Sequence, residues 1–178
     1  VLQLNGAGDL PVESDGAFAF ADPLADQAPY VVTVSRQPAN PAQTCTPQNA
    51  SGTIAGADVT EVSIVCSTES FAIGGSVTGL EGSGLILRRN GEEDLPIASN
   101  GAFTFASPQA SGTTYEITIA AEPTDPVQTC TVSNASGTVG SGDARSVTVT
   151  CATDAYVIGG TVAGLEGDLH ALDAGAGR

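Results

Sequence analysis

The sequence has no lysine, no tryptophan and no methionine, and its five basic residues are all arginine. Without lysine, the chain cannot form Lys–Asn or Lys–Asp isopeptide crosslinks, and it has no amine side chain for Schiff-base chemistry. Sortase-type joining through a pilin lysine is excluded for the same reason. Aromatic residues make up only 4% of the chain, so any core must consist mainly of valine, isoleucine and leucine.

Basic charge is equally scarce. The 20 acidic residues outweigh the arginines and give a net charge of −15. We expect no binding to nucleic acid, whose phosphates require Lys and Arg, and no attraction to anionic membranes. The charge is typical of a soluble, self-repelling surface, with the collection of divalent cations as the alternative. No stretch reaches the roughly 20 apolar residues of a spanning helix, so no membrane insertion is expected.

The residue clusters that support catalysis are missing as well. The sequence contains no catalytic triad, no phosphate-binding loop and no EF-hand motif, and His170 is its only histidine. We therefore predict a protein that is not an enzyme and has no catalytic residues, metal ligands or cofactors. His170 is expected on the surface or in a loop. The densest acidic group, residues 92–94, follows a hairpin signal and is predicted to be a solvated loop tip.

Four cysteines are present, and they form two pairs. The same spacing separates Cys45 from Cys66 and Cys130 from Cys151. A metal site needs four ligands close together, so we predict one disulfide within each pair, either between two sheets or within one. A loop of this length contributes roughly 3 kcal/mol of stability in the chain-entropy treatment. Disulfides require an oxidising compartment, which predicts an extracellular or cell-surface location.

The chain repeats itself at a constant offset of 85 residues, the difference between positions 90 and 5. The matched positions are Asn5-Gly6 with Asn90-Gly91, Phe18 and Phe20 with Phe103 and Phe105, Cys45 with Cys130, and Cys66 with Cys151. Residues 156–160 (YVIGG) match residues 71–75 (FAIGG) at the same offset. This predicts two domains, residues 1–69 (repeat 1) and residues 70–155 (repeat 2), followed by residues 156–178, the start of a third repeat.

Repeat 2 has the pattern of seven short strands. Apolar residues alternate, or form short apolar runs, within residues 71–78, 85–90, 95–98, 102–106, 115–120, 128–133 and 146–151. Turn signals such as Asn-Gly separate these runs, and residues 107–114 and 134–138 are predicted to be a loop and a turn. No segment has a helical period. We therefore predict an all-β protein built from tandem seven-stranded antiparallel β-sandwiches of Ig-like or prealbumin-like type.

Repeat 2 also resembles known modules. The runs Gly-Gly-Ser-Val-Thr-Gly, Leu-Ile-Leu-Arg-Arg-Asn-Gly, Asn-Gly-Ala-Phe-Thr-Phe and Tyr-Glu-Ile-Thr-Ile are similar to prealbumin-like repeats of bacterial surface proteins. These are the collagen-adhesin B-type and carboxypeptidase-regulatory-like modules. The cysteine segment, Gln-Thr-Cys-Thr with Val-Thr-Cys, resembles tandem immunoglobulin-like repeats of proteobacterial surface proteins. The resemblance implies a stalk or fibre module. Because the crosslinking lysine of B-type modules is absent, the disulfide would take over its stapling role.

Repeat 1 lacks the strand that opens repeat 2, because Val1 matches Ile86. The spare copy of that strand is residues 156–165, whose apolar positions are Tyr156, Ile158, Val162 and Leu165. A sheet edge without its partner strand invites pairing with another chain. We predict that residues 156–165 are donated to repeat 1 of the next subunit, head to tail, which builds a linear filament.

The predicted function is that of a structural subunit of an extracellular, pilus-like bacterial fibre. Its partner is itself, with a host or neighbouring cell surface as a further candidate. One alternative is an excerpt of a long covalent adhesin stalk, in which residues 169–177 continue a third repeat; a chain starting with Val1 is expected to be processed or an excerpt. Another is a carbohydrate- or protein-binding module. The matched sequons at Asn49 and Asn134 are open between glycosylation and ordinary turn chemistry.

Overall fold

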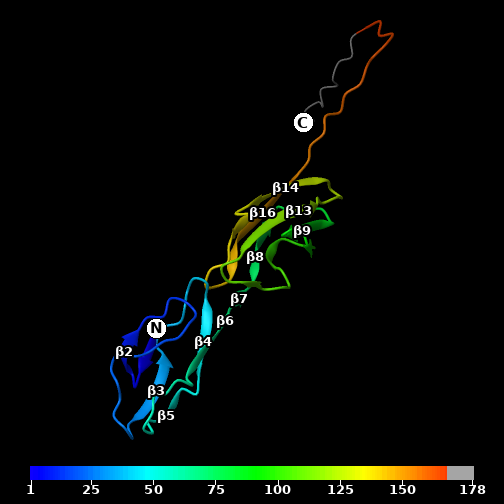
Figure 1. The fold of residues 1–178 in the computed structure, drawn as a ribbon. Coiled ribbons are helices and arrows are strands. Elements are labelled where there is room, and N and C mark those ends of the chain that lie inside the picture. Colours follow the sequence, from blue (N-terminus) through cyan, green and yellow to red (C-terminus); the bar gives the residue numbers. More distant parts are fainter. Residues whose placement is uncertain (168–178) are drawn as a thin grey trace, which may run out of the picture.

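The computed structural model describes residues 1–167, and within that range the protein is all-β without any helix (Figure 1). The predictions for His170 and for residues 169–177 concern residues outside this range. Repeat 1 and repeat 2 lie end to end, and the chain after repeat 2 runs away from the side that faces repeat 1. The all-β prediction is therefore confirmed for the described residues.

The strands of repeat 2 are the more numerous. Within residues 70–155 they are β7 (Ser70–Phe71), β8 (Ile73–Thr78), β9 (Leu85–Arg89), β10 (Glu93–Ile97), β11 (Gly101–Thr104), β12 (Gln109–Ala110), β13 (Thr114–Ala121), β14 (Gln128–Ser133), β15 (Ser136–Thr138) and β16 (Ala144–Thr153). Within residues 1–69 they are β1 (Leu2–Leu4), β2 (Ala7–Leu10), β3 (Pro29–Val34), β4 (Gln43–Gln48), β5 (Ser51–Thr53) and β6 (Ser63–Thr68).

Repeat 2 forms two four-stranded sheets, ordered β10-β9-β13-β15 and β11-β8-β16-β14. All neighbours in these sheets are antiparallel except β8 and β16, which run parallel. The inward residues of both sheets share one core, an arrangement consistent with a β-sandwich. Its most deeply buried members are Ile73, Val77, Leu85, Leu87, Ile117, Val139, Val147 and Val149.

Repeat 1 keeps only part of this arrangement. Its sheet β2-β1-β3-β5 corresponds strand for strand to β10-β9-β13-β15. Its second sheet is reduced to the pair β4 and β6. Residues 16–20, which match β11, form no strand although they carry the same alternating phenylalanines. The reason is that β11 pairs only with β8, and among residues 1–167 no strand takes the place of β8 in repeat 1.

Both predicted disulfides are present. Cys45 bonds to Cys66 and Cys130 bonds to Cys151, with Cα atoms 3.9 and 4.0 Å apart. Each pair occupies directly opposite positions on neighbouring strands, β4 with β6 and β14 with β16. The disulfides therefore lie within one sheet rather than between sheets. They indicate an oxidising, extracellular or secreted environment.

One predicted turn contains a strand. Residues 134–138 include β15, which pairs with β13 and places Ser136 opposite Glu116. The sequence of β15 is polar and shows no apolar alternation, so it gives no sign of a strand. The strand forms because the edge of β13 provides backbone groups for hydrogen bonding. The predicted loop at residues 107–114 likewise contains the short strand β12, which pairs with β7.

The prediction of a solvated loop tip at residues 92–94 is wrong for two of the three residues. Glu93 and Asp94 begin β10, and Glu93 forms an ion pair with the buried Arg89. The other carboxylate oxygen of Glu93, Oε1, accepts hydrogen bonds from the N–H groups of Ala106 and Ser107 at 3.0 and 3.2 Å. Glu93 thus ties β9 to the loop after β11.

Candidate functional site

Within residues 1–167, one side of β6 has no partner strand. In this range β6 pairs only with β4, whereas its counterpart β16 pairs with both β14 and β8. We call residues 16–20 and 59–68 together the open edge of repeat 1. Four of its apolar side chains are half-buried, namely Phe18, Phe20, Val62 and Ile64, whereas Val59 and Val65 are exposed. The matching side chains of repeat 2 are covered by β8 and are only 0–7% exposed: Phe103, Phe105, Val147 and Val149.

The segment after repeat 2 has the opposite property. Residues 156–167, called here the C-terminal segment, form no strand and project from repeat 2 (orange in Figure 1). Ile158 is 99% exposed and Val162 is 66% exposed, whereas the matching Ile73 and Val77 are at most 1% exposed. Tyr156 and Leu165 are exposed as well. Exposed apolar side chains that lie together are typical of an interaction site.

Two positions in this segment, Gly159 and Gly160, are glycine although their surroundings in the described structure do not require it. In repeat 2, a Cβ on Gly74 would overlap the backbone oxygen of Phe103, and one on Gly75 would overlap that of Val147. The small residues are needed there because β8 lies between β11 and β16. Their counterparts Gly159 and Gly160 have no atom of residues 1–167 within 4 Å of a Cβ position, and their φ values are not positive. Only a closely packed strand would require glycine at these positions.

The contact between the two repeats shows how an end of one repeat meets the next. The backbone N–H of Ser111 donates to the oxygen of Glu69 at 2.8 Å, and the N–H of Ala42 donates to Ser111 Oγ at 2.9 Å. At the far end of repeat 2, Asp154 N–H donates to the Val127 oxygen just as Glu69 N–H donates to the Ala42 oxygen. Yet Val127 is 47% exposed, whereas its counterpart Ala42 is 5% exposed. The far end therefore repeats this backbone hydrogen bond, but within residues 1–167 no neighbour covers Val127.

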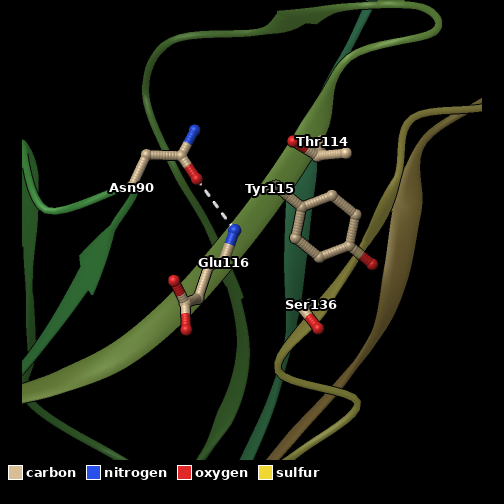
Figure 2. A pocket seen from close by; sticks show the side chains of 5 residues that line it. All are labelled: Asn90, Thr114, Tyr115, Glu116 and Ser136. Carbon is tan, nitrogen blue, oxygen red and sulfur yellow. Dashed lines mark hydrogen bonds between the residues drawn. The ribbon is translucent and has the colours of Figure 1, made fainter.

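A shallow hollow beside β13 is lined by polar groups that are already engaged. Figure 2 shows Asn90, Thr114, Tyr115, Glu116 and Ser136 around it. Asn90 Oδ1 accepts the N–H of Glu116 at 2.8 Å, and the Asn90 N–H donates to the Glu116 oxygen at 2.8 Å. Asn5 makes the same two bonds to Val31 in repeat 1. The asparagine holds the hairpin turn, where its positive φ is stabilised by these bonds.

The two sequon asparagines are also engaged in their turns. Asn49 Nδ2 donates to the Glu61 oxygen at 3.2 Å, and Asn134 Nδ2 donates to the Ser146 oxygen at 3.0 Å. In both turns, the amide nitrogen that would carry a glycan therefore donates a hydrogen bond to a backbone oxygen. Glycosylation at these sites stays an open prediction.

Among residues 1–167, no three His, Cys, Asp or Glu side chains come close enough together to hold a metal ion. No helix in the same range could cross a membrane. The aromatic side chains Phe103, Phe105 and Tyr115 lie in the core of repeat 2. Tyr156, in the C-terminal segment, is exposed.

The chain matches no protein-family model and no curated protein. The resemblance to prealbumin-like and immunoglobulin-like surface modules therefore stays a prediction. The structure brings residues 16–20 and 59–68 together as the open edge. The sequence repeat points to this region, because it shows that repeat 1 lacks the strand that opens repeat 2. The structure does not bring the C-terminal segment to that edge within one chain. Sequence reasoning missed Gln43, a polar residue beside the open edge, although the repeated triplet Gln-Thr-Cys marked it.

Proposed function

We propose that the chain consists of two tandem β-sandwich domains and is a structural subunit of an extracellular fibre. In this fibre, residues 156–165 of one copy complete the second sheet of repeat 1 in the next copy. The observation that carries the proposal is complementarity. Repeat 1 has an open edge with half-buried apolar side chains, and the C-terminal segment has exposed apolar side chains. The same residue types meet in the closed core of repeat 2.

Repeat 2 provides the expected register. There, Val147 lies opposite Gly75 and Val149 lies opposite Val77 in the parallel pair of β16 and β8. By the offset of the repeats, Val62 would lie opposite Gly160, and Ile64 opposite Val162. On the other side of the incoming strand, Phe18 would take the place of Phe103, which lies opposite Gly75. Val62 would then approach Gly160 as Val147 approaches Gly75, and Phe18 would approach Gly159 as Phe103 approaches Gly74, which explains both glycines.

The energetics favour this pairing. Full burial of a valine, isoleucine or aromatic side chain contributes about 1.5–3 kcal/mol. Burial of Tyr156, Ile158, Val162 and Leu165, together with further burial of the open edge, is the favourable contribution that opposes the cost of ordering the segment and of association. The backbone groups of the added strand gain hydrogen-bond partners on both sides.

The direction of the C-terminal segment sets the type of assembly. The segment leaves repeat 2 on the side away from repeat 1, so a contact with a neighbouring copy is head to tail. Such a contact does not close on itself and produces a linear fibre. The role is structural and non-enzymatic, the partner is another copy of the chain, and the location is the cell surface.

Light scattering and negative-stain microscopy on the purified chain test the strand donation. We expect concentration-dependent threads from residues 1–178 and monomers from a variant without residues 156–178. Threads of unchanged length from the shortened variant would overturn the proposal, as would a monomeric full chain at every concentration.

A covalent tandem stalk would place the same strand in the same slot, but within one long chain. Fibres released from the cell surface separate the two cases. After boiling in denaturant and reductant, non-covalent subunits migrate as a single species of about the size of one unit. A covalent stalk migrates as a chain many times heavier, and that result would replace strand exchange by a continuous polypeptide.

A further inference from the structure

Gln128 is a buried polar side chain that holds the turn after β8. It is 1% exposed. Its Oε1 accepts the backbone N–H groups of Glu81 and Gly82 at 2.9 and 2.8 Å. Its Nε2 donates to the Gly79 oxygen at 2.8 Å and to Thr153 Oγ1 at 3.2 Å. One amide group therefore fixes the position of residues 79–82 relative to β14 and β16.

Gln43 is the same residue at the matching position of repeat 1, on β4. Its Nε2 donates to Thr68 Oγ1 at 3.1 Å, which reproduces the bond of Gln128 to Thr153. Its Oε1 forms no hydrogen bond with any of residues 1–167, and the side chain is half-buried. The side-chain amide of Gln43 is thus already oriented by Thr68. Within the described residues, however, repeat 1 has no turn next to it like the one that Gln128 holds in repeat 2.

The matching turn is present at the end of the C-terminal segment. Gly164, Glu166 and Gly167 correspond to Gly79, Glu81 and Gly82. Gly164 and Gly79 both have φ of +74°, a value that favours glycine. In repeat 2 a Cβ on Gly79 would overlap the backbone oxygen of Cys151, whereas a Cβ on Gly164 would have no atom of the described residues within 4 Å.

We propose that Gln43 is a specificity-determining residue that recognises the turn at residues 164–167 of a second copy. Its Oε1 accepts the N–H groups of Glu166 and Gly167, and its Nε2 donates to the oxygen of Gly164. This inference rests on the proposed strand donation and extends the recognised segment from residue 165 to residue 167.

Such a contact supplies what an apolar strand cannot supply alone. A parallel strand has evenly spaced hydrogen bonds, so shifts in its register change little in the backbone pairing. A slip moves side chains relative to their neighbours, and it also removes the turn from the amide of Gln43. Gln43 therefore fixes one register and selects a segment that ends in this particular turn.

Fluorescence anisotropy with two labelled peptides, residues 154–165 and 154–167, tests the inference. The acceptor is the full chain carrying Gly160→Val, which keeps its own C-terminal segment from occupying the open edge. We expect the longer peptide to bind about tenfold more tightly, since residues 166–167 add two hydrogen bonds at about 0.5–1.5 kcal/mol each and a tenfold change corresponds to about 1.4 kcal/mol. With Gln43→Leu added, the two peptides should bind equally.

Gln48→Leu is the matched control, because Gln48 is an exposed residue on the same strand and should leave the tenfold difference intact. Equal binding of both peptides to the unaltered acceptor overturns the role of Gln43 but leaves strand donation standing. An equal loss of affinity for both peptides in Gln43→Leu also overturns the proposed role of Gln43. It would mean that the side chain supports the shape of the open edge rather than recognising the turn. If neither peptide binds, the proposed function fails, and this inference fails with it.

Discussion

Gly75 lies directly against Val147, so close that a Cβ on the glycine would overlap the backbone oxygen of the valine. This approach exists because β8 is enclosed by β11 on one side and β16 on the other. Gly160 has the same place in the sequence repeat but none of these neighbours within residues 1–167. A larger side chain at Gly160 should therefore leave the free chain unaffected but prevent its assembly.

Gly160→Val should abolish self-association while leaving the fold of both repeats unchanged. The added side chain has open space in the free chain but would collide with the backbone at Val62 in the open edge. Gly142→Val is the control, because Gly142 also has open space around it and lies outside the predicted contact. Sedimentation velocity should give a monomer for the first variant and the unaltered size distribution for the second. Threads from Gly160→Val would show that the segment does not enter a slot shaped like that of repeat 2.

The sequence was sufficient to predict the core of repeat 2. The alternation around Phe103 and Phe105 and around Val147 and Val149 placed these residues inward, and the structure buries them. The same alternation at Phe18 and Phe20 does not produce a strand. A strand needs a partner with free backbone groups, and the pattern of side chains cannot provide one.

Long-range polar contacts were beyond sequence reasoning. β15 forms because β13 presents an edge to it, and nothing in Ser-Gly-Thr indicates that pairing. The ion pair of Glu93 with Arg89 depends on the β9–β10 hairpin register, which sets these residues opposite each other. Gln43 and Gln128 are glutamines at matching positions of the two repeats. The importance of the match could be recognised only from the hydrogen bonds that Gln128 accepts in the structure.

Gln128→Leu should lower the free energy of unfolding of repeat 2 by about 1–3 kcal/mol, the cost of leaving buried backbone N–H groups unpaired. Gln43→Leu should lower that of repeat 1 by less than about 0.5 kcal/mol, because only one partly exposed side-chain bond is lost. Urea unfolding of each variant below the assembly concentration measures the difference. Equal losses at both positions would mean that Gln43 already supports the fold of the free chain.

The two disulfides should differ in their rate of reduction. Cys66 is exposed, whereas Cys130 and Cys151 are each 5% exposed. Because thiol–disulfide exchange requires access to a sulfur atom, limiting reductant should open the Cys45–Cys66 bond first. Alkylation followed by mass spectrometry identifies which cysteines react.

Assembly should slow the reduction of the same bond. An added strand beside β6 would cover it as β8 covers β16, so the rate at Cys45–Cys66 should fall toward that at Cys130–Cys151. The chain carrying Gly160→Val provides the control, and its rate should not depend on concentration. A rate unaffected by assembly of the unaltered chain would place the intermolecular contact elsewhere.

Arg88→Gln should raise the pKa of Asp94 toward its ordinary value of 3.8. The hydrogen bond from Arg88 and the attraction between their charges lower the pKa of Asp94, with desolvation opposing them. Arg88 Nε donates to Asp94 Oδ1 at 2.6 Å, whereas in repeat 1 the uncharged Gln3 takes the place of Arg88 and its Nε2 donates to Asp9 Oδ1 at 2.7 Å. Carbon-detected NMR titration of the Asp94 carboxyl measures the change.

A lowered pKa means that the folded state binds the proton less readily than the unfolded state. The pair therefore stabilises the fold above the ordinary carboxyl pKa, and this contribution is lost as the pH falls through the lower pKa of the folded state. The stability difference between the unaltered chain and Arg88→Gln should accordingly be present at neutral pH and disappear in acid. Asp143, whose pKa is lowered chiefly by its hydrogen bond from Arg145, should titrate identically in both proteins. An Asp94 titration that Arg88→Gln leaves unchanged would show that the ion pair does not persist in solution, as exposed pairs often do not.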